Sequence, residues 1–219
     1  MSAQTFNFAG QHILSVNQFN RDAIEYIFHI ANQMRPYAQR QKRTEVLRGA
    51  ILGNLFFEPS TRTRVSFGTA FNLLGGEVRE TVGMSNSALA KGESLYDTAR
   101  VLSGYSDIIT MRHPQAGSVA EFAAGSRVPV INGGDGANEH PTQALLDLYT
   151  IEKECQSHGT KIDGLHIAMI GDLKYGRTVH SLCKLLSLYN NIHFTLISPT
   201  ELAMPEPILT AITNCGHKL

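Results

Sequence analysis

The sequence predicts an α/β protein with two parallel-sheet domains and helices on both faces of the sheets, the second domain being incomplete. Two observations lead to this fold class. Short apolar runs of strand length alternate along the chain with segments in which apolar residues recur at helical spacing. In addition, 42% of the 219 residues are hydrophobic and only 17% are charged, so the chain can bury a sizeable core.

Residues 1–157 are predicted to form the first domain. An amphipathic helix follows Asn20 and is expected to end before Pro36, because the residue before a proline disfavours helical geometry. Strands are expected at residues 47–57, 77–82, 107–111 and 128–131, and a glycine-rich loop at 132–139. Helices are expected after Ser60 as far as Gly75, over 93–104 and 118–125, and from Pro141 towards Glu154. This alternation predicts a parallel sheet.

Residues 158–219 are predicted to form a partial second domain. The polar segment 156–163 contains Gly159 and marks the boundary. A strand at 165–170, a helix, a strand at 192–198 and a helix after Pro205 follow. About 60 residues is short for an α/β domain, which commonly has ~100 or more.

Charge and composition argue against several classes of function. Nineteen basic and nineteen acidic residues give a formal net charge of zero, which argues against a general binder of nucleic acid or membrane surfaces. No apolar run is long enough to span a bilayer, and residues 1–10 lack the apolar core of a signal peptide. The three cysteines are isolated, so we expect reduced thiols in a cytoplasmic protein, with neither disulfides nor a zinc site.

The stretch Ser60-Thr61-Arg62-Thr63-Arg64 lies where the first strand turns into a helix. The first amide N–H groups of a helix have no partner within it, and the helix dipole makes this end positive. Together with the hydroxyls and an arginine, these groups suit an anion, phosphate above all. The alternative is an ordinary capped helix with exposed arginines.

Three polar clusters follow strands of the first predicted sheet: Ser60–Arg64, Arg112–Pro114 and Asn138–Gln143. Because the carboxyl ends of parallel strands meet at one edge, we expect these clusters to converge on a ligand. Arg62 and Arg112 can neutralise a phosphate. His140 can donate to a carbonyl oxygen or move a proton, and Gln143 can pair with an amide-like group. An acyl phosphate fits this set, and no metal-binding cluster is evident.

The turn Gly171–Thr178 is similar to the phosphate loop of nucleotide hydrolases. Arg177 replaces the lysine of that loop, however, and Asp172 would bring a carboxylate beside the phosphates. We therefore interpret this segment as a tight strand-to-helix turn that presents Arg177 to a carboxylate.

Taken together, these residues resemble the catalytic chains of the aspartate carbamoyltransferase family. The motifs Ser60–Arg64 and His140–Gln143 are shared by the whole carbamoyltransferase superfamily. Three further motifs look like the aspartate enzymes and unlike the ornithine ones: Lys91–Glu93, Met111–Pro114 and Gly171–Ser181. The resemblance extends from about Phe6 to the end of the chain.

The resemblance implies transfer of the carbamoyl group from carbamoyl phosphate to the amine of L-aspartate, as in pyrimidine biosynthesis, without a metal or organic cofactor. The implied ligands of carbamoyl phosphate are Ser60, Thr61, Arg62, Thr63, Arg112, His140 and Gln143. Arg112, Thr63 and His140 would stabilise the tetrahedral oxyanion. Arg177 would bind the aspartate α-carboxylate, with Glu58 orienting it.

The family works as trimers with shared active sites, so Ser87 and Lys91 would lie on a mobile loop that reaches a neighbouring subunit. Whether regulatory chains bind is left open. Family members also continue with further strands, helices and another aspartate-binding arginine, so we expect the 219-residue chain alone not to turn over aspartate at a useful rate. Two hypotheses remain: a transferase, complete or completed by a missing segment, and an inactive carbamoyltransferase-like scaffold or fragment that binds carbamoyl phosphate only.

Overall fold

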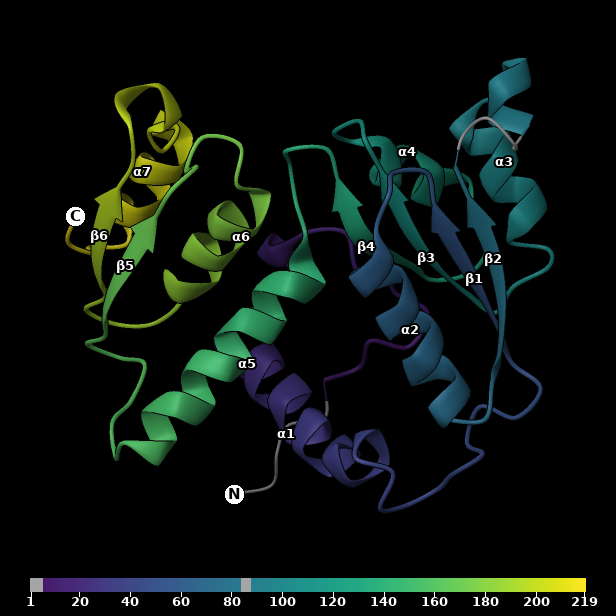
Figure 1. Ribbon diagram of the computed structural model, residues 1–219, viewed down its shortest axis with the longest axis horizontal. Helices are drawn as coiled ribbons and strands as arrows, with labels where there is room; N and C mark the ends of the chain where they lie inside the picture. The colour runs from purple at the N-terminus through teal and green to yellow at the C-terminus, as the bar shows by residue number, and fades with distance from the viewer. Residues whose placement is uncertain (1–5, 84–87) are drawn as a thin grey trace. The chain divides into compact units, whose positions relative to one another are not determined.

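A computed structural model describes residues 6–83 and 88–219 of the chain (Figure 1). It divides into two compact units. The first comprises Met1–Leu14 and Tyr26–Asn138, and the second comprises Ser15–Glu25 and Glu139–Leu219. The boundary between the compact units therefore lies between Asn138 and Glu139. The domain boundary that the sequence analysis places after residue 157 stays a prediction.

The first unit contains a four-stranded parallel sheet. Its strands are β1 (Ile51–Phe56), β2 (Glu77–Val82), β3 (Ile108–His113) and β4 (Val130–Asp135), in the order β2-β1-β3-β4 (Figure 1). All three strand pairs are parallel, as the sequence predicted. The N-terminal segment extends this sheet slightly, because Ile13 bridges Ile131 beside β4.

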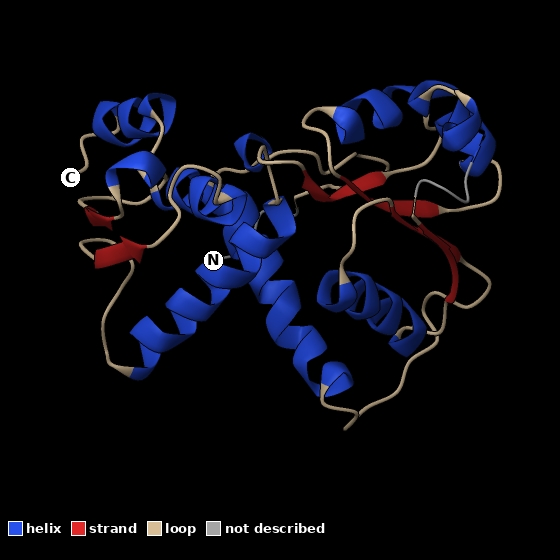
Figure 2. Cartoon of the chain, turned by 45° about the horizontal axis from the view of Figure 1, so that its top comes forward, coloured by secondary structure: helices blue, strands red, loops and turns tan. Residues whose placement is uncertain are grey.

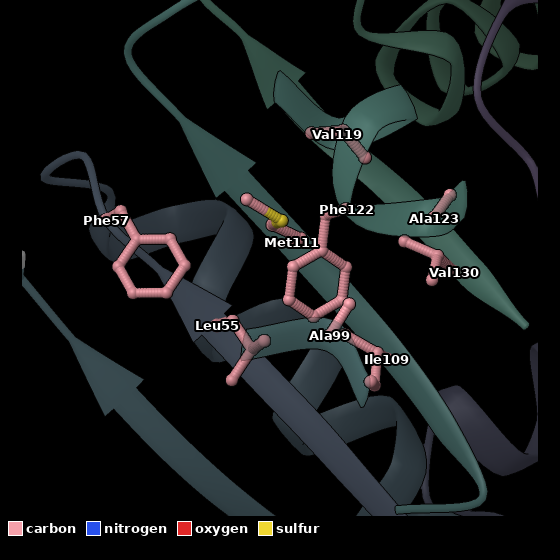
Figure 3. Packing of buried hydrophobic residues seen from close by; sticks show 9 residues of the cluster. All are labelled: Leu55, Phe57, Ala99, Ile109, Met111, Val119, Phe122, Ala123 and Val130. Carbon is pink, nitrogen blue, oxygen red and sulfur yellow. The ribbon is translucent and has the colours of Figure 1, made fainter. Parts of the chain in front are cut away.

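Helices cover both faces of this sheet (Figure 2). Helix α2 (Thr61–Leu73) lies on one face, and α3 (Leu95–Leu102) and α4 (Ser118–Gly125) lie on the other. The core beneath α3 and α4 is shown in Figure 3 and consists of Leu55, Phe57, Ala99, Ile109, Met111, Val119, Phe122, Ala123 and Val130. Burying a leucine or phenylalanine side chain of this kind stabilises the fold by about 1.5–3 kcal/mol, so this layer holds the strand ends in place.

Some element boundaries differ from the sequence-based expectation. Helix α1 (Arg21–Ala38) continues through Pro36, because a proline in the last turn removes only one intrahelical hydrogen bond. The Pro36 carbonyl still accepts a hydrogen bond from the Gln41 N–H at 2.8 Å. Residues 47–50 form a turn and not strand, with the Ala50 N–H bonded to the Leu47 carbonyl. Strand β4 also extends through the glycines expected to be loop: the register with β3 shifts there, and pairing resumes between His113 and Asp135.

The second unit contains the helices α5 (Pro141–Ser157), α6 (Arg177–Leu186) and α7 (Glu206–Asn214), with the parallel strands β5 (His166–Ile170) and β6 (His193–Ile197). The chain end pairs with the outer edge of β6, where Lys218 bridges His193. Fully buried side chains hold these elements together: Leu173, Leu185, Leu186, Ile192 and Ile212. The unit thus has a two-stranded sheet with its own core, which agrees with the incomplete second domain predicted from the sequence.

Short 3₁₀ helices complete the structure: η1 (Val16–Gln18), η2 (Ala88–Lys91) and η3 (Thr200–Leu202). No helix within the described ranges combines the length and the apolar character needed to cross a bilayer.

Candidate functional site

The strand order of the first unit reverses between β1 and β3. From β1 the chain passes through α2 to the edge strand β2, and then returns to β3 on the opposite side of β1. In open parallel sheets, ligands bind outside the carboxyl ends of the strands at such a reversal. The Ser60 loop follows β1, and Arg112 on β3 is the register partner of Phe56 at the end of β1. Two of the predicted clusters therefore lie at the reversal.

The first turn of α2 can bind an anion, because the Ser60 side chain does not accept a hydrogen bond from its N–H groups. Ser60 occupies the N-cap position in an extended conformation, as predicted, but its side chain makes no capping hydrogen bond. Side-chain caps normally satisfy one of the unpaired N–H groups at a helix start. Here that donor is left to another acceptor, and the positive end of the helix dipole favours a negatively charged one.

Arg112 supplies a guanidinium group next to this turn. Its side chain is 13% exposed, and one terminal nitrogen donates to Glu58 Oε1 at 3.1 Å. The Phe57 N–H donates to the Arg112 carbonyl at 2.9 Å, which ties the beginning of the Ser60 loop to β3. Among the described residues, Arg112 Nε is buried and has no hydrogen-bond partner. A buried unsatisfied donor is unfavourable, so an acceptor placed here by a ligand would relieve its cost.

The two arginines of the Ser60 loop differ. Arg62 is exposed and forms no ion pair with any part of the chain that the structure describes. Arg64, by contrast, is paired with Glu80 on β2. The loop therefore presents one arginine outward and uses the other within the fold.

A buried aspartate that the sequence analysis missed holds the neighbouring loops. Asp135 accepts hydrogen bonds from the Gly117 N–H at 2.9 Å and from the side-chain amides of Asn132 and Asn138, both at 3.0 Å. The available signal was an acidic residue at the end of a glycine-rich buried strand. Asp135 fixes the loops after β3 and β4 to one another.

His113 directly follows Arg112 and is buried. Burial lowers the pKa of its imidazole, although the Gln115 backbone hydrogen bond and nearby carboxylates raise it in part. Its Nδ1 accepts the Gln115 N–H at 3.1 Å, and its ring meets the Phe57 ring edge-on at a centroid distance of 5.9 Å. His113 therefore packs against Phe57 and shapes the end of β3.

The predicted residues His140 and Gln143 lie at the start of α5, in the second unit. His140 is at the N-cap position and 4% exposed, and its N–H donates to Ser181 Oγ at 3.4 Å. Gln143 Nε2 donates to Asp147 Oδ1 at 2.8 Å. Burial raises the pKa of Asp147, and the bond from Gln143 opposes that shift.

Glu139, which the sequence analysis also missed, fixes His140 within the second unit. Its buried carboxylate accepts from Lys184 Nζ and Ser181 Oγ, both at 2.8 Å, and from Ser15 Oγ at 3.1 Å. An acidic residue next to the histidine motif was the only signal in the sequence. The ion pair connects the start of α5 to α6.

Arg177 is the first residue of α6 and follows a tight turn, as predicted. Asp172 Oδ1 accepts the N–H groups of Lys174 at 3.1 Å and Tyr175 at 2.9 Å, which closes the turn. A Cβ at Gly176 would lie 2.6 Å from the Asp172 carbonyl oxygen, so this close approach requires glycine.

Of the two predicted loop residues, the structure describes Lys91 and not Ser87. Lys91 is exposed at the end of η2, and Ser87 lies outside the described residues.

No group of histidine, cysteine, aspartate or glutamate side chains in residues 6–83 and 88–219 is arranged to hold a metal ion. The structure thus brings the Ser60–Thr63 turn and Arg112 to adjacent strand ends, and the roles of all these residues stay predictions.

Comparison with known proteins decides the family. Residues 11–153 match the family model described as "Aspartate/ornithine carbamoyltransferase, carbamoyl-P binding domain". The chain belongs to this family. It is 71% identical to the "Aspartate carbamoyltransferase catalytic subunit" of Cellvibrio japonicus and 71% identical to that of Saccharophagus degradans, over 97% of this chain in each case. It spans 63% of the length of each of these relatives.

Solved structures of the family agree in fold. The catalytic subunit of aspartate transcarbamoylase from M. jannaschii is 47% identical, with a TM-score of 0.87 over 95% of this chain and 67% of that one. The Trypanosoma cruzi aspartate transcarbamoylase in complex with carbamoyl phosphate and aspartate is 42% identical, with a TM-score of 0.87 over 96% of this chain and 70% of that one. The predicted α/β fold is therefore confirmed.

Proposed function

We propose that the first unit binds carbamoyl phosphate at the carboxyl ends of β1 and β3, and that the protein transfers its carbamoyl group to L-aspartate. The products are N-carbamoyl-L-aspartate and phosphate. One observation carries the proposal: Arg112, whose buried Nε has no partner among the described residues, lies beside a helix start that has no side-chain cap. Both features favour an anion that also offers a further acceptor oxygen.

The phosphate and the carbonyl make different demands on the site. In this proposal, the N–H groups of Thr61–Thr63, the hydroxyl of Ser60 and the guanidinium of Arg62 receive the phosphate. Glu58, which the resemblance assigned to Arg177, accepts from Arg112 instead, and we propose that it directs Arg112 to donate to the carbonyl oxygen and to a phosphate oxygen. A guanidinium suits this role because its planar donors are fixed relative to one another.

The reaction then proceeds by attack of the aspartate amine on the carbonyl carbon. A C–N bond forms, the carbonyl becomes a tetrahedral oxyanion, and the C–O bond to phosphate breaks while the amine proton leaves with the phosphate. Thr63, Arg112 and His140 are proposed to stabilise the oxyanion. Removing one such preorganised donor typically costs about 3 kcal/mol of transition-state stabilisation.

The remaining roles are proposed from the resemblance to the aspartate carbamoyltransferase family. Gln143 is proposed to recognise the carbamoyl amide, and Arg177 the aspartate α-carboxylate. Ser87 and Lys91 are proposed to act in trans within a homotrimer located in the cytoplasm. The names of the relatives as catalytic subunits are compatible with additional, regulatory chains.

A second candidate function for the 219 residues by themselves is binding of carbamoyl phosphate without transfer. These residues span 63% of the length of the Cellvibrio japonicus relative, so the comparison supports the carbamoyl phosphate-binding part more directly than the whole reaction. With this function, the chain binds carbamoyl phosphate and forms no product.

Two measurements on the 219-residue protein separate these functions. Calorimetry with phosphonoacetamide, a non-hydrolysable analogue, reports binding, and a colorimetric assay for N-carbamoyl-aspartate reports transfer. Binding with product formation supports the transferase, and binding without product supports the second candidate. Absence of binding would overturn the proposal for the first unit.

A further inference from the structure

The first turn of α2 contacts a partly buried polar cluster that the proposed chemistry does not use. It consists of Asn54 on β1, Arg64 on α2 and Glu80 on β2, and we call it the polar clamp. The Asn54 side-chain amide donates to the Arg64 carbonyl at 3.0 Å and to Glu80 Oε1 at 3.2 Å. Glu80 Oε2 accepts from the Arg64 guanidinium. One asparagine therefore contacts both partners of an ion pair.

The location of Asn54 indicates that the clamp is more than a surface ion pair. Asn54 is 0% exposed, within a strand that is otherwise apolar apart from one glycine. Its Oδ1 is buried and without a partner in the described part of the chain. Leaving a buried carbonyl oxygen unsatisfied is unfavourable, and an apolar residue at this position would avoid that cost. The fold tolerates this cost while both N–H groups of the amide are used to hold α2 and β2.

The packing of α2 brings the clamp close to the proposed anion site. Asn54 and Glu80 are register partners on neighbouring strands. A Cβ at Gly68, one turn beyond Arg64, would lie 3.8 Å from both the Asn54 amide nitrogen and Glu80 Oε1. The helix therefore sits directly on the clamp, and Arg64 follows Thr63 without an intervening residue. The clamp thus joins the first turn of α2 to β1 and β2.

We infer that Arg64, Glu80 and Asn54 are positioning residues for the anion-binding turn, and that Arg64 is not a ligand of the phosphate. This inference rests on the proposed function. Arg64 is 29% exposed and Glu80 is 36% exposed, and the two side chains form an ion pair with one another. The clamp keeps Arg62 and the N–H groups of Thr61–Thr63 oriented before the ligand arrives, which reduces the cost of ordering on binding.

The two possible roles of Arg64 predict opposite effects of removing its partner. If Arg64 were a phosphate ligand, Glu80→Gln would release its guanidinium and tighten binding. If it is a positioning residue, the same change loosens the turn and weakens binding. A partly exposed ion pair is worth up to about 1 kcal/mol, which corresponds to at most about a fivefold loss of affinity.

The chain provides a matched control on the same strand. Glu77→Gln removes the same charge from β2, but Glu77 is 60% exposed and pairs with the exposed Arg79 at 2.8 Å. Subtracting its effect corrects for the general loss of negative charge. Arg64→Lys is a second variant, because it keeps the positive charge and loses the planar donors.

The experiment is calorimetry of the folded variants with phosphonoacetamide, together with amide hydrogen exchange of residues 65–70 without ligand. We expect Glu80→Gln and Arg64→Lys to bind two- to fivefold more weakly than the wild type, and Glu80→Gln to exchange faster in this segment, while Glu77→Gln resembles the wild type in both. Tighter binding by Glu80→Gln, or binding and exchange equal to those of Glu77→Gln, would overturn the inference. If the wild type does not bind at all, the proposed function fails, and the exchange comparison then decides the clamp by itself.

Discussion

Replacing Arg112 by glutamine removes the charged group on which the proposed site depends most. The substitution deletes the guanidinium that donates to Glu58 Oε1 at 3.1 Å and the buried Nε that has no partner among the described residues. Glutamine retains much of the apolar stem and a neutral amide. The perturbation is therefore concentrated on charge and donor geometry, with limited loss of packing.

The structure sets the expected magnitude. The Arg112 side chain is 13% exposed, so its interaction with an anion is poorly screened by solvent. Truncating one partner of a buried, hydrogen-bonded charge pair costs about 2–5 kcal/mol. The lower value corresponds to a loss of affinity of about 30-fold. We expect the dissociation constant for phosphonoacetamide to rise by at least this factor in Arg112→Gln, and by less in Arg112→Lys, which keeps the charge.

Calorimetry measures the affinity, and circular dichroism during heating shows whether each variant is folded. Arg48→Gln is the matched control, because Arg48 is 83% exposed and its pair with Glu45 is a surface contact at 3.4 Å. It removes the same charge from the same unit and should bind within twofold of the wild type. Folded Arg112→Gln protein that binds within threefold of Arg48→Gln would refute the assignment of Arg112 to the site.

Three further predictions concern other parts of the molecule. Arg62→Ala should weaken phosphonoacetamide binding by about tenfold or more. The melting temperature should not change, because Arg62 is exposed and has no ion pair among the described residues. A lower melting temperature with unchanged affinity would contradict this prediction. Burial raises the pKa of Asp163, but the hydrogen bond from the Asn190 N–H and the ion pair with Arg21 outweigh burial and hold the pKa below 3.8. The ion pair with Arg21 therefore stabilises the folded protein above pH 3.8, and this stabilisation is lost as pH falls through the lowered pKa. Urea unfolding should therefore show Arg21→Gln about 0.2–1 kcal/mol less stable than the wild type at pH 7 and equal to it well below that pKa, whereas a pH-independent difference would be inconsistent with the ion pair. Gly136→Ala should destabilise the protein by about 1–3 kcal/mol, because its Cβ would lie 2.8 Å from the Ala116 N and Pro114 O atoms. The loss should exceed that of the control Gly49→Ala, whose Cβ meets nothing within 4 Å. Equal urea midpoints for the two variants would contradict this prediction.

Much of the fold could be predicted because local patterns and tertiary packing agree. The helix at 118–125 and the strand at 77–82 were placed at the residues where the structure has them. Predictions failed where pairing or helix propagation overrides local preference. Strand β4 continues through Gly133 and Gly134 because His113 pairs with Asp135 beyond a register shift, and α1 continues through Pro36 because only one hydrogen bond is lost.

The candidate site was predictable in part for the same reason. The Ser60 loop and Arg112 were expected at strand ends, and the parallel register of β1 and β3 places them there. Long-range polar partners were not predictable. Glu80 lies in an alternating edge strand and reads as an exposed residue, although Asn54 and Arg64 both contact it. An asparagine within an apolar strand was the signal that a polar contact existed, but one sequence does not reveal its partner.

The central claim is that the turn at 60–63 and Arg112 form one anion site. The most direct test is a titration of the isotopically labelled 219-residue chain with phosphonoacetamide, followed by nuclear magnetic resonance of the backbone amides and the arginine Nε–H groups. The account predicts saturable shifts of the Thr61–Thr63 amides and of the Arg112 Nε–H with a common dissociation constant. Saturable shifts confined to the turn at 171–176, with residues 60–63 and Arg112 unchanged, would contradict it.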